Sequence, residues 1–77
     1  MTVNEFARRL HHADAKERGG LYDSAKDFLS ARKATINAIE GTVAVDKAMA
    51  ETYPADETFR QNILKAEAAL KLLRETP

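Results

Sequence analysis

The residues best suited to chemistry lie in the stretch His11-His12-Ala13-Asp14, which contains both histidines of the chain. Zinc takes three or four ligands from histidine, cysteine and carboxylate side chains. Neighbouring helical residues point about 100° apart, so His11 and His12 do not readily share one ion, and the chain has no cysteine. We therefore predict no metal site and no cofactor. We interpret the two histidines as a solvated helix end that faces the negative end of the helix dipole.

Nucleophilic catalysis would need Ser24 or Ser30 beside a histidine, an orienting acid and an oxyanion site. The sequence contains neither a nucleophile elbow nor a glycine-rich phosphate loop. The remaining carboxylates are typical of solvated helix faces. We therefore predict that the protein is not an enzyme.

The length of the chain favours an interaction protein instead. Its 77 residues form one domain at most, 1–77, and a domain this short lies near the lower limit for a self-sufficient core. Small helical chains often gain the missing burial by self-association or by docking on another protein. We accordingly expect protein–protein contact, with a homo-oligomer as the first expectation.

The charge pattern argues against a nucleic-acid partner. Twelve basic and twelve acidic residues are evenly mixed and give a formal net charge of zero, whereas a nucleic-acid binder concentrates positive charge on one element. The opening segment 2–10, TVNEFARRL, resembles the first helix of excisionase-type helix-turn-helix domains, but no turn and recognition helix follow at suitable spacing. A DNA-associated regulator is therefore only a second alternative.

The hydropathy of the chain predicts a soluble, cytoplasmic protein. No apolar run approaches the roughly 18 residues of a membrane span. The beginning of the sequence also lacks the apolar core of a signal peptide. We expect no membrane partner.

The first predicted helix covers about 3–18. Thr2 and Glu5 have the spacing of a capping box, and helical spacing continues through an apolar row of Val3, Phe6, Leu10 and Ala13. Gly19-Gly20 then supplies residues that adopt positive φ easily, which is typical of a helix terminator.

The second predicted helix covers about 23–52, with Asp23 or Ser24 as its cap. Gly41-Thr42 either ends this helix or only bends it, and we favour a continuous helix with a bend at Gly41, because one glycine costs only about 1 kcal/mol relative to alanine. Pro54 ends the helix, since the residue before a proline avoids the α conformation.

The third predicted helix covers about 56–75 and begins at Asp56, a good N-cap. Its apolar residues have the clearest heptad spacing in the chain: Phe59, Ile63, Ala66, Leu70 and Leu73. The predicted fold is all-α, a small three-helix unit built on a long antiparallel helical hairpin.

Two charged residues interrupt the apolar stripe of the second helix. Arg32 and Asp46 fall on positions that are otherwise apolar. Either the helix bends or rotates and leaves both solvated, or they fix a pairing register or contact a ligand. Together with residues near the predicted helix ends, they complete the set of candidate interface or ligand-binding residues: Tyr22, Arg32, Lys33, Asp46 and Tyr53.

Several alanines, including Ala68 on the third helix, lie off the main apolar stripes. Small side chains on a second face permit close helix approach, including approach between chains. Alanine is also simply the best helix former. The sequence leaves both explanations open.

One segment suggests a ligand. Tyr53-Pro54-Ala55-Asp56-Glu57, followed by 66–72, AEAALKL, is similar to the C-terminal helix of small phage hairpin proteins that oligomerise and sequester cyclic-nucleotide immune signals. The similarity covers about twenty residues, needs a one-residue shift and lacks the tryptophan usual near Leu72. It implies a helical oligomer that binds nucleotides. For this alternative we expect a pocket between protomers, with Arg32, Lys33 and the tyrosines as contacts.

The sequence therefore predicts a small non-enzymatic protein–protein interaction module, homo-oligomeric, of the accessory or inhibitor type found in phages, plasmids and bacteria. The first alternative is a helical oligomer that binds or sequesters a small nucleotide-type ligand.

Overall fold

The computed structural model describes residues 1–76, and these residues form helices joined by short turns. In chain order the elements are α1 (Val3–His12), α2 (Ala15–Asp23), a 3-10 segment η1 (Ala25–Ala31), α3 (Arg32–Thr52) and α4 (Glu57–Glu75). The all-α class is confirmed. The number of helices is not, because both the first and the second predicted helix are divided.

The first helix ends six residues earlier than predicted. It begins as expected, with the Glu5 backbone N–H donating to Thr2 Oγ1 at 3.2 Å, but it stops at His12. Ala13 and Asp14 are extended, and Asp14 caps a new helix by accepting from the Glu17 N–H at 2.8 Å. Asp14 is an N-cap residue type three positions before a glutamate, so a local start signal was present here.

The prediction that Gly19-Gly20 terminates a helix is wrong. Both glycines lie inside α2, and no glycine within residues 1–76 has a positive φ. The reason at Gly19 is tertiary packing. A Cβ there would lie 2.7 Å from Asn62 Oδ1 on α4, so the missing side chain lets two helices approach closely.

The second predicted helix is divided at Phe28 and continuous through Gly41. Phe28 has φ −115° and ψ 30°, outside the helical region, and its ring packs against Phe6 with centroids 4.8 Å apart. Regular α-helix begins only at Arg32 and then runs unbroken to Thr52. A buried aromatic contact with α1, which lies far away in the sequence, thus outweighs local helix propensity.

The start of α4 agrees with the prediction, since Asp56 accepts a hydrogen bond from the Thr58 N–H at 2.9 Å. Its predicted apolar row faces the protein interior: Phe59, Ala66, Leu70 and Leu73 are buried and Ile63 is partly buried.

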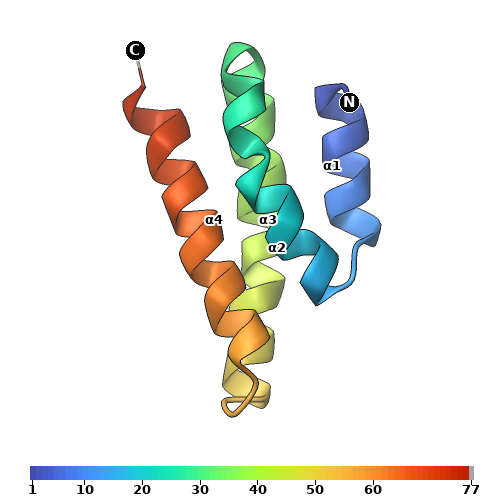
Figure 1. The fold of residues 1–77 in the computed structure, drawn as a ribbon, viewed down its shortest axis with the longest axis vertical. Coiled ribbons are helices and arrows are strands. Elements are labelled where there is room, and N and C mark those ends of the chain that lie inside the picture. The colour runs from blue at the N-terminus through green and yellow to red at the C-terminus, as the bar shows by residue number, and fades with distance from the viewer. Residues whose placement is uncertain (77) are drawn as a thin grey trace.

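α3 and α4 run side by side in opposite directions, α2 lies in front of α3 and packs against α4, and α1 lies beside α3 (Figure 1). The core lies between these helices and is formed by the largest fully buried apolar side chains, Tyr22, Phe6, Leu10, Ile39 and Leu73. Among residues 1–76, no helix combines the length and the apolar character needed to cross a lipid bilayer.

Candidate functional site: a buried polar cluster beneath an apolar helix face

The most unusual interior feature is a carboxylate at the centre of the helix packing. Asp46 on α3 is fully buried. Arg18 of α2 donates to it from Nη2 at 2.8 Å and from Nε at 3.2–3.3 Å. A buried carboxylate without partners costs several kcal/mol, so this pairing makes the position tolerable.

Further hydrogen bonds join Asp46 and Arg18 to their surroundings. Tyr22 donates its hydroxyl proton to Asp46 Oδ2 at 2.8 Å, and Asn62 of α4 donates to Asp46 Oδ1 at 3.2 Å. The Asn62 amide also reaches the Ala15 carbonyl at 2.6 Å, and Arg18 Nη1 reaches the Ala13 carbonyl at 3.0 Å. Three helices therefore converge on one carboxylate.

The burial of this cluster changes the acidity of its members. Desolvation, followed by the hydrogen bond and charge of Asp46, raises the pKa of the Tyr22 hydroxyl well above its usual value of 10.0, although the Thr42 hydroxyl and Arg18 partly oppose this. The hydrogen bond to Asp46 raises the pKa of the Arg18 guanidinium. At neutral pH the tyrosine is therefore a neutral donor and the arginine a fixed cation.

This arrangement positions the helices relative to one another. The cluster holds α2 against both α3 and α4, with Gly19 allowing the close approach to Asn62. Within residues 1–76, every fully buried side-chain nitrogen or oxygen atom has a hydrogen-bond partner. The polar atoms of the cluster that are fully buried are therefore paired within the protein.

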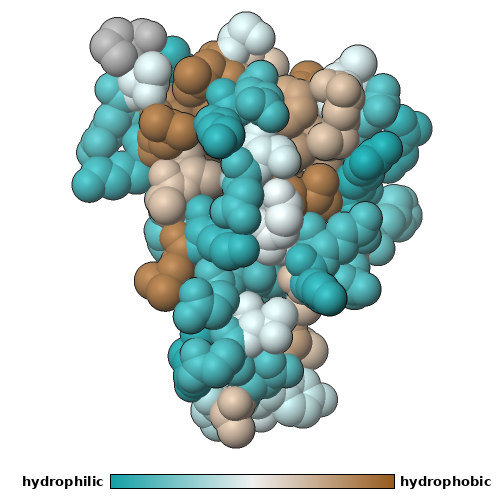
Figure 2. Space-filling model, viewed as in Figure 1, coloured by the Kyte–Doolittle hydropathy of each residue, from teal (hydrophilic) through white to brown (hydrophobic). Residues whose placement is uncertain are grey.

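The outer face of α4 carries a row of exposed apolar residues among its charged ones. Leu64 is 63% exposed and Leu72 is 41% exposed, and exposed Ala68 lies between them. These three residues are spaced four apart, so they form one row along the helix. We call Leu64, Ala68 and Leu72 the α4 row. Figure 2 shows the resulting hydrophobic surface on the side where α4 lies.

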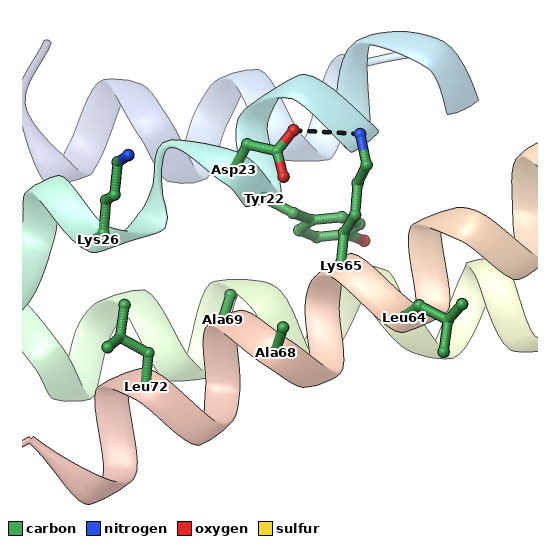
Figure 3. Close-up of a pocket in the computed structure, with 8 residues that line it drawn as sticks. All are labelled: Tyr22, Asp23, Lys26, Leu64, Lys65, Ala68, Ala69 and Leu72. Atoms are coloured by element: carbon green, nitrogen blue, oxygen red, sulfur yellow. Dashed lines mark hydrogen bonds and ion pairs between the residues drawn. The ribbon is translucent and has the colours of Figure 1, made fainter.

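A hollow of about 340 Å³ lies between α4 and α2, and its wall includes Tyr22 and all three residues of the α4 row. Figure 3 shows the ion pair between Asp23 and Lys65, 3.1 Å apart, bridging the two helices over the Tyr22 ring. A shallower hollow continues along α4 and is lined by Ala68, Lys71, Leu72, Glu75 and Thr76.

A second hollow of about 450 Å³ lies between α1 and α3. Small residues, Ala7, Ala38 and Gly41, form part of its wall, and the polar groups of His11, Asn37, Arg18 and Thr42 also line it. Arg18 and Thr42 are already bonded within the buried cluster, so only the histidine and the asparagine offer groups without a partner in that cluster.

The candidate residues from the sequence are partly brought together. Tyr22 and Asp46 meet in the buried cluster, so the interpretation of Asp46 as a solvated residue is wrong. Arg32 lies at the N-terminal end of α3, where its guanidinium donates to the Thr76 carbonyl, and exposed Lys33 follows it. Tyr53 lies at the opposite end of α3, where its ring stacks on Phe59.

Sequence reasoning missed three residues of this region: Arg18, Asn62 and Leu64. The partners of Asp46 are 28 and 16 positions away, so no local spacing connects them. Leu64 did carry a signal, because it is a large apolar residue off the predicted core stripe of its helix.

The histidines are exposed at a helix end, as interpreted from the sequence, but they lie in the last turn itself because α1 stops at His12. In the described part of the chain, no three residues of the types His, Cys, Asp and Glu are grouped to hold a metal ion. Comparison with known proteins adds no family: no family model, no curated protein and no solved structure matches this chain.

Proposed function

We propose that this protein is a non-enzymatic interaction module that binds another protein chain through the outer face of α4. The observation that carries the proposal is the α4 row, in which two leucines are 63% and 41% exposed on a rigid helix. Exposed apolar groups that form a continuous surface mark protein contacts more often than scattered ones do.

The buried cluster supports the same proposal, because a preorganised surface loses less conformational entropy when it binds. Asp46 and its partners fix α2 against α4, and the Asp23–Lys65 pair joins their outer edges. Residues of α2 and α4 line the hollow between these helices, and the buried cluster holds the two helices in place before a partner arrives.

A pull-down from the native source tests the proposal with two matched variants. Leu64→Lys places a charge in the α4 row, whereas Val45→Lys makes the same change at a residue 50% exposed on α3. We expect unchanged helix content in both, a bound protein with the wild type and Val45→Lys, and at least about tenfold less with Leu64→Lys, since burying an unpaired charge costs more than 1.4 kcal/mol. Equal capture by all three would refute the proposal.

The hollow between α1 and α3 favours a second candidate function, binding of a small nucleotide-type ligand. Its wall combines apolar surface with the His11 imidazole and the Asn37 amide, a mixture common in small-molecule sites. A thermal-shift screen with nucleotides tests it, because a ligand at 100 times its Kd adds about 2.7 kcal/mol to the free energy of unfolding. An unchanged Tm throughout would exclude the nucleotides used. The accessory or inhibitor role expected from the sequence stays a prediction.

A further inference from the structure

The outer face of α4 has a hollow that is suited to accept Leu64 from a second α4 helix. The shallow hollow on α4 is lined by Ala68, Lys71, Leu72 and Glu75 together with Thr76. The first four are related as i, i+3, i+4 and i+7, the diamond of residues that accepts one knob in knobs-into-holes packing. Leu64, 63% exposed one turn before Ala68, is a suitable knob.

The order large–small–large in the α4 row is the same in both directions. When two copies of α4 pair antiparallel about a two-fold axis at Ala68, Leu64 of each lies level with Leu72 of the other. The two alanines then face each other at the axis. A two-fold interface requires such a self-complementary surface, and alanine at the crossing permits close helix approach.

The charges around the knob and the hole also match in this orientation. Leu64 lies between Arg60, one turn before it, and Glu67, three residues after it, and both are about half exposed. Antiparallel pairing brings Arg60 toward Glu75 of the second copy and Glu67 toward Lys71. Parallel insertion of the same knob would instead bring Glu67 level with Glu75 of the second copy, a pair of like charges.

From this pattern we infer that the protein bound by the α4 face is a second copy of this chain, docked antiparallel with Leu64 of each copy in the hollow of the other. The inference rests on the proposed function and names its partner. One helix face is smaller than the roughly 800 Å² that each partner contributes to a standard interface. We therefore expect a weak dimer, whose fraction rises with protein concentration.

Disulfide trapping tests the geometry, because the chain has no cysteine of its own. Ala68→Cys places a thiol at the two-fold axis. With helix axes about 8–10 Å apart, the facing Cα atoms come within the range that a disulfide spans. Gln61→Cys lies seven residues from the axis, so its two copies are about 21 Å apart in the antiparallel dimer. Ala48→Cys on the exposed side of α3 is the collision control.

We expect Ala68→Cys to form covalent dimers at least about tenfold faster than Ala48→Cys, since pairing raises the effective thiol concentration to the millimolar range. Gln61→Cys should react at the control rate. Adding Leu64→Lys to Ala68→Cys should return that variant to the control rate as well. Circular dichroism of the reduced variants checks that each keeps its helices.

Other outcomes separate this inference from the function on which it rests. Fast trapping of Gln61→Cys would show parallel pairing and overturn the inference. So would an Ala68→Cys rate no higher than that of Ala48→Cys. If the pull-down then still shows capture lost with Leu64→Lys, the partner is a different protein and only the proposed function stands. If capture is also unaffected, both fail.

Discussion

Asp46 and its partners provide the sharpest energetic contrast in the protein. The carboxylate is fully buried and paired with Arg18 of α2, whereas the neighbouring Lys47 pairs with Glu67 of α4 at 3.3 Å and both of those side chains are about half exposed. Breaking a buried pair leaves a desolvated charge, while exposed pairs contribute little because water and salt screen them. Breaking the buried Asp46–Arg18 pair should therefore cost far more stability than breaking the exposed Lys47–Glu67 pair, although their N···O distances are similar.

We predict that Asp46→Asn lowers the free energy of unfolding by about 2–4 kcal/mol. Glu67→Gln, the same chemical change at the exposed pair, should lower it by less than about 0.5 kcal/mol. Urea unfolding followed by circular dichroism measures both. Equal midpoints for the two variants would show that the buried pair is not a principal source of stability.

The raised pKa of Tyr22 predicts a loss of stability in alkali. An unfolded tyrosine releases its proton near pH 10, but the buried one retains it to higher pH, so above pH 10 the folded state binds more protons than the unfolded state. Stability is therefore complete below pH 10 and falls above it, by up to about 1.4 kcal/mol per pH unit.

Urea midpoints at pH 8, 10 and 11 measure this loss. Tyr22→Phe should remove it, and Tyr53→Phe, at a tyrosine 53% exposed, should keep it. If Tyr22→Phe and the wild type lose stability in parallel, Tyr22 is not the group responsible.

The three glycines share an unfavourable helix propensity but differ in whether the surrounding packing leaves room for a side chain. Gly19, Gly20 and Gly41 all lie within helices, where alanine is favoured by about 0.5–1 kcal/mol. A Cβ at Gly19 meets Asn62 Oδ1 at 2.7 Å, whereas a Cβ at Gly20 or Gly41 meets nothing within 4 Å.

We predict that Gly20→Ala and Gly41→Ala each raise the free energy of unfolding by about 0.5–1 kcal/mol. Gly19→Ala should lower it by about 1–3 kcal/mol, because α2 or α4 must shift and Asn62 must leave Asp46. Thermal unfolding gives the sign in each case. A gain in Tm for Gly19→Ala would contradict the close approach of α2 and α4.

At the level of helices, the sequence predicts best what local contacts decide. The caps at Thr2 and Asp56 and the buried row of α4 follow from spacing alone. The break at Phe28 and the continuous helix through Gly19 do not, because each depends on a contact with a distant helix. Asp14 is a third case, because its capping signal is local but lies inside the segment 3–18 that was predicted as one helix.

The candidate site divides in the same way. Asp46 could be selected from the sequence because it is a charge among apolar positions, and Tyr22 because it lies near a predicted helix end. Their contact could not be predicted, nor could Arg18 or Asn62, since hydrogen bonds between helices depend on how those helices pack. Leu64 was predictable in principle as an apolar residue on the outer side of α4.

The whole molecule is thin, with extents of 36 × 24 × 16 Å. Its shortest dimension is only about one and a half times the 10–12 Å diameter of a helix, so no helix is covered on all sides. Every helix has an outer face, and the outer face of α4 carries two exposed leucines, Leu64 and Leu72, in one row. The shape of the fold thus explains why surface chemistry, rather than an enclosed cavity, dominates the proposed function.

The most direct test of self-association through α4 is the mass of the unmodified chain by sedimentation equilibrium over a wide concentration range. If the chain self-associates through α4, the mass should rise from the 8.5 kDa of one chain toward twice that value. Leu64→Lys should remain at the lower value, and Val45→Lys should follow the wild type. A wild-type mass of one chain up to millimolar concentration, or an equal rise for wild type and Leu64→Lys, would contradict self-association through α4.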